Sequence, residues 1–332
     1  MREKGCYLGI DVGSVSTNLV IIDSYGNILE KLYLKTGGQP IKAIRSGINI
    51  LADVFGQSID ILGAGTTGSG RQLANVIIGS DIVKNEITSH AVAAQKLVPN
   101  VRTILEIGGQ DSKIILVRNG VVYDFAMNTV CAAGTGSFLD RQASRLEIPI
   151  EEFGKYALSS TLAVRIAGRC AVFAESDMIH KQQTGHSIED IINGLCEALV
   201  RNYMNNLAKG KELAEPIVFQ GGVAANQGIV AAFERELKAK IIIPEYYDVM
   251  GAYGAALMAR EKMRHKAYKT NFVGFDISKK DYKVSTMECH DCSNMCELIK
   301  IISDDVVLAR WGDRCGKWSE LDRNYGQVSL GH

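Results

Sequence analysis

One pattern occurs twice in this chain: an apolar strand, a polar turn that contains glycine, a second apolar strand and a hairpin turn. The first copy spans residues 7–34, with its polar turn at 11–16 and its hairpin at 25–27. The second copy starts at residue 101, with its polar turn at 108–112 and its hairpin at 118–120. Because helix-like segments follow both copies, we predict an α/β protein built from two lobes that begin in the same way.

A chain of 332 residues is long enough for two lobes and a small appendage. We expect lobe I to comprise residues 1–99 and 250–265, lobe II residues 100–249, and a cysteine-rich module residues 270–326. A basic stretch at 264–269 is interpreted as the linker to this separate module. Further strands are expected at 59–63, 217–220 and 241–243, and helices at 41–55, 137–147, 171–183, 188–209, 227–239 and 249–265.

The charge balance argues against two classes of partner. Lys and Arg together number 37 and equal Asp and Glu at 37, so no basic excess indicates binding to nucleic acid or to an anionic membrane surface. No apolar run reaches the roughly 18 residues that a membrane span needs, and no targeting segment is visible, so a cytoplasmic location is expected. Eight cysteines in such a chain favour metal or redox roles over disulfides.

Several short loops have the composition of phosphate-binding turns. A triphosphate needs backbone N–H groups, hydroxyls and small residues around its oxygens, and a carboxylate to orient Mg²⁺. One such loop taken alone is more often a plain tight turn, so the prediction depends on the whole set. The candidate residues are Asp11, Gly13, Ser14, Val15, Ser16 and Thr17; Gly108, Gly109, Gln110 and Asp111; Gly134, Thr135 and Gly136; and Gly221, Gly222 and Asn226.

In this order the loops resemble the ATPase superfamily of actin, Hsp70 and the sugar kinases. Its two phosphate motifs would be residues 9–17 and 106–113, its adenosine motif 218–226, and its connecting helices would begin at 133–136 and 251–256. The resemblance implies a two-lobed actin/Hsp70/sugar-kinase-like (duplicated ribonuclease-H-like) fold with ATP or ADP and Mg²⁺ in the interlobe cleft. The roles it implies are metal orientation by Asp11, positioning of water or metal by Gln110 and Asp111, phosphate contacts from Ser14, Ser16 and Thr17, and adenosine contacts from Gly221, Gly222 and Asn226. Thr66 and Thr67 are expected to line the same cleft.

Two cysteines stand in matched contexts, Cys131 within residues 128–140 and Cys170 within residues 168–177. Each precedes a helix-forming run that starts with small residues, which places the thiol at a helix N-terminus, where the helix dipole favours a thiolate. A lone cysteine is more often a small buried apolar residue. Two thiols cannot hold a cubane cluster, which usually takes four, but a twofold dimer would supply four at its axis.

The first 262 residues or so closely resemble the BadF/BadG/BcrA/BcrD type of ATPase, which includes activators of 2-hydroxyacyl-CoA dehydratases, ATPase subunits of benzoyl-CoA reductases and the reductase of double-cubane-cluster proteins. The resemblance implies that Cys131 and Cys170 of two subunits ligate one shared [4Fe–4S] cluster in a homodimer. It also implies ATP-driven electron transfer at low potential, from a ferredoxin or flavodoxin to a dehydratase-, aryl-CoA-reductase- or double-cubane-type Fe–S protein. Two alternatives stay open: a kinase for a small molecule such as a sugar or carboxylate, and a non-enzymatic nucleotide-dependent regulator.

The C-terminal module carries four more cysteines, Cys289, Cys292, Cys296 and Cys315. Apolar runs at 299–302 and 306–311 predict a β-hairpin that returns Cys315 to the other three, as in a zinc-ribbon-like unit. Zn²⁺ is slightly favoured over a second Fe–S cluster, and His290 could replace one thiolate. The remaining cysteines, Cys6 and Cys196, are interpreted as core residues, and His180 and His186 as surface residues.

Overall fold

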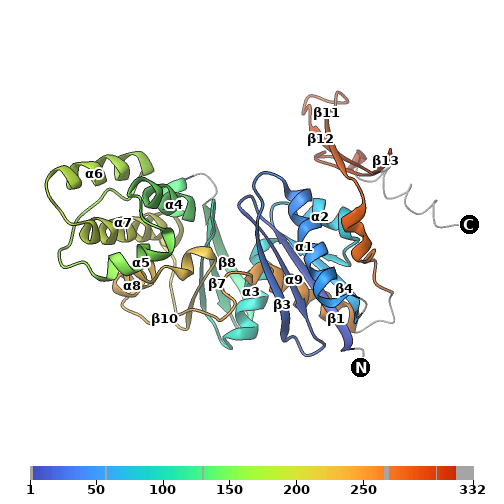
Figure 1. The fold of residues 1–332 in the computed structure, drawn as a ribbon, viewed down its shortest axis with the longest axis horizontal. Helices are drawn as coiled ribbons and strands as arrows, with labels where there is room; N and C mark the ends of the chain where they lie inside the picture. The colour runs from blue at the N-terminus through green and yellow to red at the C-terminus, as the bar shows by residue number, and fades with distance from the viewer. Residues whose placement is uncertain (1–2, 57, 129–130, 265–268, 304, 319–332) are drawn as a thin grey trace, which may run out of the picture.

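The structure, a computed structural model, describes residues 3–56, 58–128, 131–264, 269–303 and 305–318. Figure 1 shows two lobes side by side, with a small C-terminal sheet on the outer side of lobe I. The elements of lobe I are β1 (Glu3–Val12), β2 (Ser16–Ile22), β3 (Ile28–Lys35), α1 (Pro40–Phe55), β4 (Ile59–Thr67), α2 (Arg71–Ile78), β5 (Ile82–Val83), α3 (Glu86–Leu97) and, from the far end of the chain, α9 (Met250–Arg264).

Lobe II holds the second sheet and a thick layer of helices. Its strands are β6 (Thr103–Ile107), β7 (Ser112–Arg118), β8 (Val121–Asn128), β9 (Ile217–Gln220) and β10 (Ile241–Ile242). Its helices are η1 (Ala132–Gly134), α4 (Gly136–Arg145), α5 (Ile150–Leu158), α6 (Ala171–Gln183), α7 (Ile188–Tyr203), the π-helix η2 (Met204–Ala208), η3 (Gly222–Ala225) and α8 (Gln227–Leu237).

The two sheets have the same topology. The strand order is β3-β2-β1-β4-β5 in lobe I and β8-β7-β6-β9-β10 in lobe II. In both, the first strand pairs antiparallel with the second and parallel with the fourth, which follows a helical crossover. The repeat predicted from the sequence is therefore a duplicated α/β unit, in agreement with the expected two-lobed fold.

Helix α9 joins the lobes because it packs closely on lobe I and contributes to a core shared with lobe II. A Cβ atom on Gly9 of β1 would lie 1.9 Å from the Ala252 carbonyl oxygen of α9, so only glycine permits this approach. The apolar cluster around α9 includes Ile115 of β7 and Val218 of β9 as well as Val20 of β2. The base of the cleft is thus a continuous apolar core rather than a loose linker.

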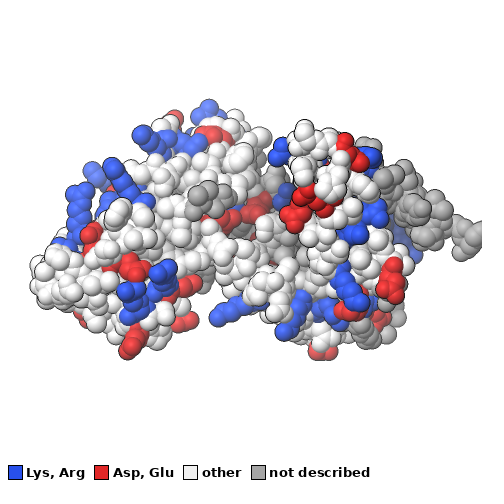
Figure 2. Space-filling model, turned by 90° about the horizontal axis from the view of Figure 1, so that it is seen from above, with Lys and Arg blue, Asp and Glu red and all other residues white. Residues whose placement is uncertain are grey.

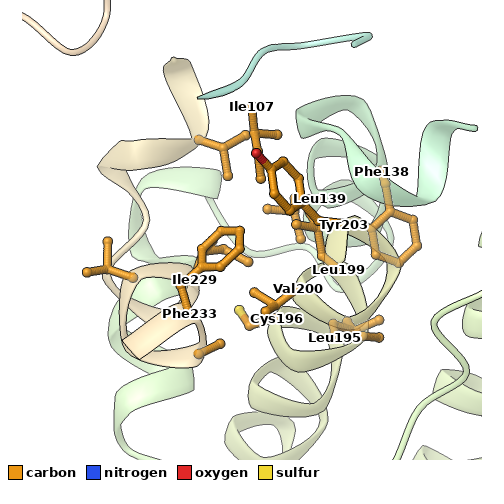
Figure 3. Packing of buried hydrophobic residues seen from close by; sticks show 14 of the residues in the cluster. Ile107, Phe138, Leu139, Leu195, Cys196, Leu199, Val200, Tyr203, Ile229 and Phe233 are labelled. Carbon is orange, nitrogen blue, oxygen red and sulfur yellow. The ribbon is translucent and has the colours of Figure 1, made fainter. Parts of the chain in front are cut away.

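The core of lobe II forms between its sheet and helices α7 and α8 (Figure 3). Tyr203, Phe219 and Phe233 pack edge to face, with ring centroids 5.3 and 5.1 Å from Phe233. Cys196 is fully buried among them, and burial raises the pKa of its thiol to about 12. Cys6 is likewise fully buried in lobe I, so the core assignment of both cysteines is confirmed.

The C-terminal residues pack directly on lobe I. The buried Asp81 carboxylate accepts hydrogen bonds from the Thr270 hydroxyl (2.7 Å) and the Asn271 amide (2.8 Å). Ile277 and Ile301 belong to the same apolar core as β1, β4 and α1. The three-stranded sheet that follows consists of β11 (Lys283–Glu288), β12 (Glu297–Ser303) and β13 (Val306–Trp311), so the predicted hairpin is confirmed and gains a third strand.

Residues 265–268 of the expected linker, and the end of the expected module from 319 onward, lie outside the described residues. In the described part, no helix combines the length and apolar character needed to cross a bilayer.

Candidate nucleotide cleft and cysteine sites

A cavity of about 250 Å³ opens between the lobes, where the polar turns of both copies of the repeat meet. The register pairs Val12 with Thr17 in lobe I and Ile107 with Ser112 in lobe II, so both turns project from equivalent edges of their sheets. The predicted residues that line this cavity are Asp11, Gly13, Ser14, Val15, Ser16, Gly108, Gly109, Gln110, Asp111, Gly221 and Gly222.

Glycines allow the two turns to approach each other. A Cβ on Gly109 would lie only 2.6 Å from the Val15 side chain of the other lobe, so a larger residue would push the turns apart. Within each turn a backbone bond closes the loop, from Gly13 N to Ser16 O (2.8 Å) and from Gly108 N to Asp111 O (3.0 Å). Such closed, glycine-containing loops leave other N–H groups free to face an anion.

Asp11 lies at the end of β1, in a gap that two other glycines leave open. A Cβ on Gly68 would be 2.4 Å from Asp11 Oδ1, and a Cβ on Gly251 would be 2.0 Å from Asp11 Oδ2. Burial and the nearby Glu86 carboxylate raise the pKa of Asp11 to about 7. A buried carboxylate that is costly to ionise is one that a divalent cation would stabilise.

The cleft floor holds a lysine surrounded by carboxylates, a feature that the sequence patterns did not indicate. Lys113 Nζ lies 2.9 Å from Glu86 Oε2, 3.0 Å from Glu106 Oε2 and 2.9 Å from Asp111 Oδ2. Burial lowers the pKa of Lys113, but the three carboxylates outweigh it and raise the pKa overall. Burial raises the pKa of Glu106 to about 8.

With Asp11, the cleft floor holds four carboxyl groups and one ammonium group, so it becomes negatively charged once Asp11 and Glu106, whose pKa values are raised, ionise. Figure 2 shows acidic side chains gathered over the waist between the lobes. This charge suits Mg²⁺, which proteins commonly bind through one or two carboxylates while water and phosphate supply the other ligands. Glu86 comes from lobe I and Lys113 from lobe II, so their ion pair also bridges the lobes.

A buried histidine completes the floor. Gln220 Nε2 lies 2.7 Å from His90 Nδ1, and burial followed by the Lys113 charge lowers the pKa of His90 to about 3. The ring is therefore neutral at physiological pH and accepts the amide hydrogen bond at Nδ1.

A second, larger cavity of about 570 Å³ adjoins the first and shares Val15, Gly109 and Gly222 with it. Two predicted residues, Gly136 and Asn226, line only this cavity, next to the apolar side chains of Leu139 and Ile150. Asn226 Oδ1 caps α8 by accepting from the Gly228 amide (3.0 Å), while its buried Nδ2 has no hydrogen-bond partner among the described residues. The lining also includes Asp140, Glu151 and Asp248. A pocket with one apolar wall and an unused donor can accept a flat heteroaromatic group.

Other predicted cleft residues lie behind the cavity walls. The Thr17 hydroxyl is buried and bonds to Thr36 Oγ1 (2.9 Å), so it shapes the turn instead of facing the cavity. Thr135 is buried, and its hydroxyl donates to Ala132 O (2.8 Å). Thr66 and Thr67 are fully buried in β4. These four residues and Gly134 are absent from the linings of both cavities.

Cys131 and Cys170 lie on adjacent segments of lobe II. Cys170 is the N-cap of α6, as the sequence predicts, whereas Cys131 is the N-cap of the three-residue turn η1 and the N-cap of α4 is Thr135. Cys131 Sγ lies 4.0 Å from the carbonyl oxygen of Arg169, the residue before Cys170. Thr129 and Val130 of the predicted motif lie outside the described residues.

The surface beside these thiols is suited to an interface. Both thiols are partly exposed, and Val172 and Phe173, which follow Cys170, are 68% and 65% exposed. Soft thiolates at helix N-termini are suitable ligands for an anionic iron–sulfur cluster, so the donor set fits such a group when a second copy adds two more thiols.

The thiols of the C-terminal sheet are close in sequence but are not gathered into a ligand set. The Cys289 amide donates to Cys296 O (2.8 Å), and Trp318 Nε1 lies 3.3 Å from Cys289 Sγ. Among the residues with described positions, no three His, Cys, Asp or Glu side chains form a group that could hold a metal ion. The predicted four-thiolate centre is therefore not preformed among the described residues, where Cys289 is buried and Cys292 and Cys315 are exposed.

Comparison with known proteins gives a consistent result. Residues 8–259 match the sequence profile of the BadF/BadG/BcrA/BcrD ATPase family. The chain is 36% identical over 255 residues to the (R)-2-hydroxyglutaryl-CoA dehydratase activating ATPase of Acidaminococcus fermentans, covering 77% of this chain and 97% of that protein. It is 28% identical over 262 residues to one of the benzoyl-CoA reductase subunits of Thauera aromatica, covering 75% and 91%.

Solved structures agree with the sequence comparison. The activator of 2-hydroxyisocaproyl-CoA dehydratase from Clostridium difficile with bound ADPNP superposes with a TM-score of 0.71 at 32% identity, covering 78% of this chain and 96% of that one. Component A of (R)-2-hydroxyglutaryl-CoA dehydratase from Acidaminococcus fermentans gives the same TM-score at 34% identity, covering 78% and 99%.

Proposed function

Because the chain belongs to the BadF/BadG/BcrA/BcrD ATPase family, we propose that it is an ATP-hydrolysing reductive activator that transfers low-potential electrons from a [4Fe–4S] cluster to a partner iron–sulfur enzyme. The names of its relatives, which activate 2-hydroxyacyl-CoA dehydratases or form part of a benzoyl-CoA reductase, support a partner of the dehydratase, aryl-CoA reductase or double-cubane type. A ferredoxin or flavodoxin is the proposed electron donor.

One observation carries the proposal: the phosphate turn of lobe II is bonded directly to the segment that bears Cys131. The Gly136 amide donates to Gly108 O (2.9 Å) and the Ser137 amide to Gly109 O (2.8 Å). The Ser137 hydroxyl donates to Gly109 O as well. A change in the turn on ATP binding or hydrolysis therefore acts on the start of α4, next to Cys131.

In the proposed nucleotide complex, Mg²⁺ lies at Asp11, with Gln110 and Asp111 positioning the metal or the attacking water. The backbone and hydroxyls of residues 13–16 hold phosphate oxygens. The neighbouring cavity of about 570 Å³ takes the adenosine, which packs on Gly221 and Gly222 and accepts a hydrogen bond from Asn226 Nδ2. The residues given these roles line one or both cavities.

The cluster, when bound, supplies a carrier of single electrons. Cys131 and Cys170 of each subunit hold it in a homodimer, since one chain offers only two suitably placed thiols and a cubane usually needs four. The exposed Val172 and Phe173 next to Cys170 are apolar enough to contribute to the contact between subunits.

The test is anaerobic purification followed by iron analysis and ATPase measurement. We expect brown protein with about two iron atoms per chain, the share of one four-iron cluster in a dimer. Cys131→Ala and Cys170→Ala are each expected to lose this iron and keep ATP binding. Colourless wild-type protein whose ATP turnover depends on a sugar or a carboxylate would contradict the proposal and favour a kinase.

The metal of the C-terminal sheet, Zn²⁺ or a second Fe–S cluster, is a separate proposal that rests on the cysteine spacing alone. The purified protein distinguishes the two: zinc at about one per chain supports a thiolate zinc site. Iron beyond two per chain without zinc supports a second cluster. Cys292→Ala is expected to remove that metal and leave the iron bound at Cys131 unchanged.

A further inference from the structure

We propose that Asn202 is a positioning residue that ties the Cys131 and Cys170 segments together, and that Tyr203 connects this tie to the nucleotide cleft. The inference rests on the proposed function, because it concerns how the cleft controls two thiols that would share a cluster.

Asn202 contacts both cysteine segments from the end of α7. Its Nδ2 donates to Gly168 O at 2.6 Å, two residues before Cys170, and lies 3.8 Å from Cys131 Sγ. The side chain is buried, with 2% exposed. Gly134, three residues after Cys131, encloses the other end of the Asn202 side chain. A Cβ on Gly134 would lie 2.7 Å from Asn202 Oδ1. One buried side chain thus fixes the spacing of the two segments.

Tyr203, the next residue, points into the sheet instead. Its hydroxyl donates to Lys113 O at 2.6 Å, and the residue is 1% exposed. Figure 3 shows its ring among the apolar side chains of the lobe II core. The side chain of that same Lys113 lies in the cleft, where its Nζ pairs with Glu86 of lobe I at 2.9 Å. A shift of Lys113 on nucleotide binding therefore reaches Tyr203 through one buried hydrogen bond. It reaches Asn202 through the peptide bond that joins Asn202 to Tyr203.

The helix around these residues is suited to transmit such a shift. The π-helix Met204–Ala208 starts directly after Tyr203, and π-helical turns frequently occur at functional sites. Arg201, on the other side of Asn202, donates from Nη2 to Ile166 O at 2.6 Å. Three successive residues of α7 thus connect the sheet, the Cys131 segment and the chain leading to Cys170.

Two sets of hydrogen bonds connect the cleft to the two cysteine segments, one set to each segment. The bonds from Gly108 and Gly109 reach α4 and hence the Cys131 segment. The bonds of Arg201 and Asn202 reach the segment of Cys170. The structure therefore assigns two roles. Tyr203 passes a change in the cleft to the segment of Cys170, and Asn202 couples the movement of that segment to the movement of the Cys131 segment.

The experiment measures thiol reactivity in the full-length, iron-free protein, kept reduced and free of metals other than added Mg²⁺. Iodoacetamide alkylation rates of Cys131 and Cys170 are followed by mass spectrometry, with and without Mg²⁺ and a non-hydrolysable ATP analogue. In wild type we expect the analogue to change both rates by at least about fivefold, the lower end of typical coupling between sites. In Tyr203→Phe, the change at Cys170 is expected to fall below about twofold while the change at Cys131 persists.

Asn202→Asp tests the tie itself with a side chain of equal size. Its carboxylate cannot donate to Gly168 O, so Cys170 is expected to react faster than in wild type even without nucleotide. Asn193→Asp is the matched control, because Asn193 lies on the same helix and its side chain accepts a hydrogen bond from the exposed Arg235. Cys196 is an internal monitor of folding, since its buried thiol with a pKa raised to about 12 reacts only if the lobe opens.

The outcomes separate the inference from the proposed function. If calorimetry shows that the analogue does not bind wild-type protein, the proposed function and the inference both fail. If it binds but Tyr203→Phe keeps the full wild-type response at Cys170, the inference alone is overturned. If Cys196 of Asn202→Asp becomes reactive, that variant has unfolded and Tyr203→Phe decides the outcome.

Discussion

Replacing Glu106 by glutamine in the cleft floor is expected to change how stability depends on pH in the protein free of Mg²⁺ and nucleotide. The pKa of Glu106 is raised from 4.5 to about 8, and that of Asp11 from 3.8 to about 7. A carboxyl group whose pKa is raised on folding stabilises the fold fully below its unfolded pKa, and this stabilisation is lost as pH rises through the folded pKa. Both groups therefore destabilise the empty protein as the pH rises from 6.5 to 8.5.

The magnitude follows from the two pKa values. Between pH 6.5 and 8.5 the ionisation of Glu106 removes about 2 kcal/mol of the free energy of unfolding, and that of Asp11 less than about 1 kcal/mol. A glutamine side chain cannot ionise, so the variant is expected to lose less than about 1 kcal/mol over this range. His90 does not interfere, because a pKa lowered from 6.5 to about 3 affects stability only as the pH falls below about 6.5.

The assay is urea unfolding in chelator at several pH values between 6.5 and 8.5. Glu236→Gln, on the exposed side of α8, is the control and is expected to keep the wild-type slope. Mg²⁺ with an ATP analogue is expected to restore most of the loss at pH 8.5, since a cation stabilises the ionised carboxylates. Equal slopes for wild type and Glu106→Gln would refute the view that this carboxyl group is held protonated in the empty cleft.

Three further predictions test the packing at the cleft, in the lobe II core and between the C-terminal sheet and lobe I. Gly251→Ala puts a Cβ 2.0 Å from Asp11 Oδ2, so we expect ATP turnover to fall up to about 100-fold with the fold retained by circular dichroism. Phe233→Ala empties the centre of the lobe II core and is expected to lower the free energy of unfolding by about 3–5 kcal/mol in denaturant titrations. Ile301→Asp places an unpaired charge in the core shared with lobe I, so thermal melting should show lobe I itself destabilised by about 3 kcal/mol, whereas an independent C-terminal module would leave it unchanged.

The sequence located the polar turns that line the cleft because the residues of each turn are contiguous. The pairing of Lys113 with Glu86 joins residues from two lobes, and no local pattern states which acidic residue will meet a lysine. The sequence contains part of the information about Glu86. Asn85 is a typical N-cap residue, which caps α3 by accepting from the Thr88 amide, and an acidic residue follows it in the first turn. That signal predicts a helix start but not that this start faces the cleft.

Hydroxyl residues show the same limit at the level of single side chains. Ser14 and Thr17 are three residues apart and equally plausible as phosphate ligands by composition. Alternation along β2 and the bond to Thr36 turn Thr17 inward, while Ser14 lies exposed in the turn. Which hydroxyl faces a ligand is decided by strand register, and register depends on pairing across the sheet.

The C-terminal residues illustrate a limit that concerns domains. Phe272 and Phe275 follow a basic stretch that resembles a linker, yet they pack against the lobe I core and against each other, with ring centroids 5.6 Å apart. An apolar pair in a short segment does not reveal its docking surface, because that surface is formed by α1 and the sheet of lobe I. The cysteine-bearing sheet is consequently anchored to the lobe that lacks Cys131 and Cys170.

The charge of the cleft and the tie at α7 can be understood as two parts of one arrangement. Three carboxylates pair with Lys113, and Asp11 adds a fourth carboxyl group to the cleft floor. Under the proposed function, a ligand that brings Mg²⁺ would release free energy that can shift Lys113. Lys113 is also the residue whose carbonyl holds Tyr203, and so its displacement need not cross the whole lobe to affect the cysteine segments. A cleft without this charge would still bind nucleotide. The nucleotide would then distinguish less strongly between two conformations of the protein, and it would shift the equilibrium between them less.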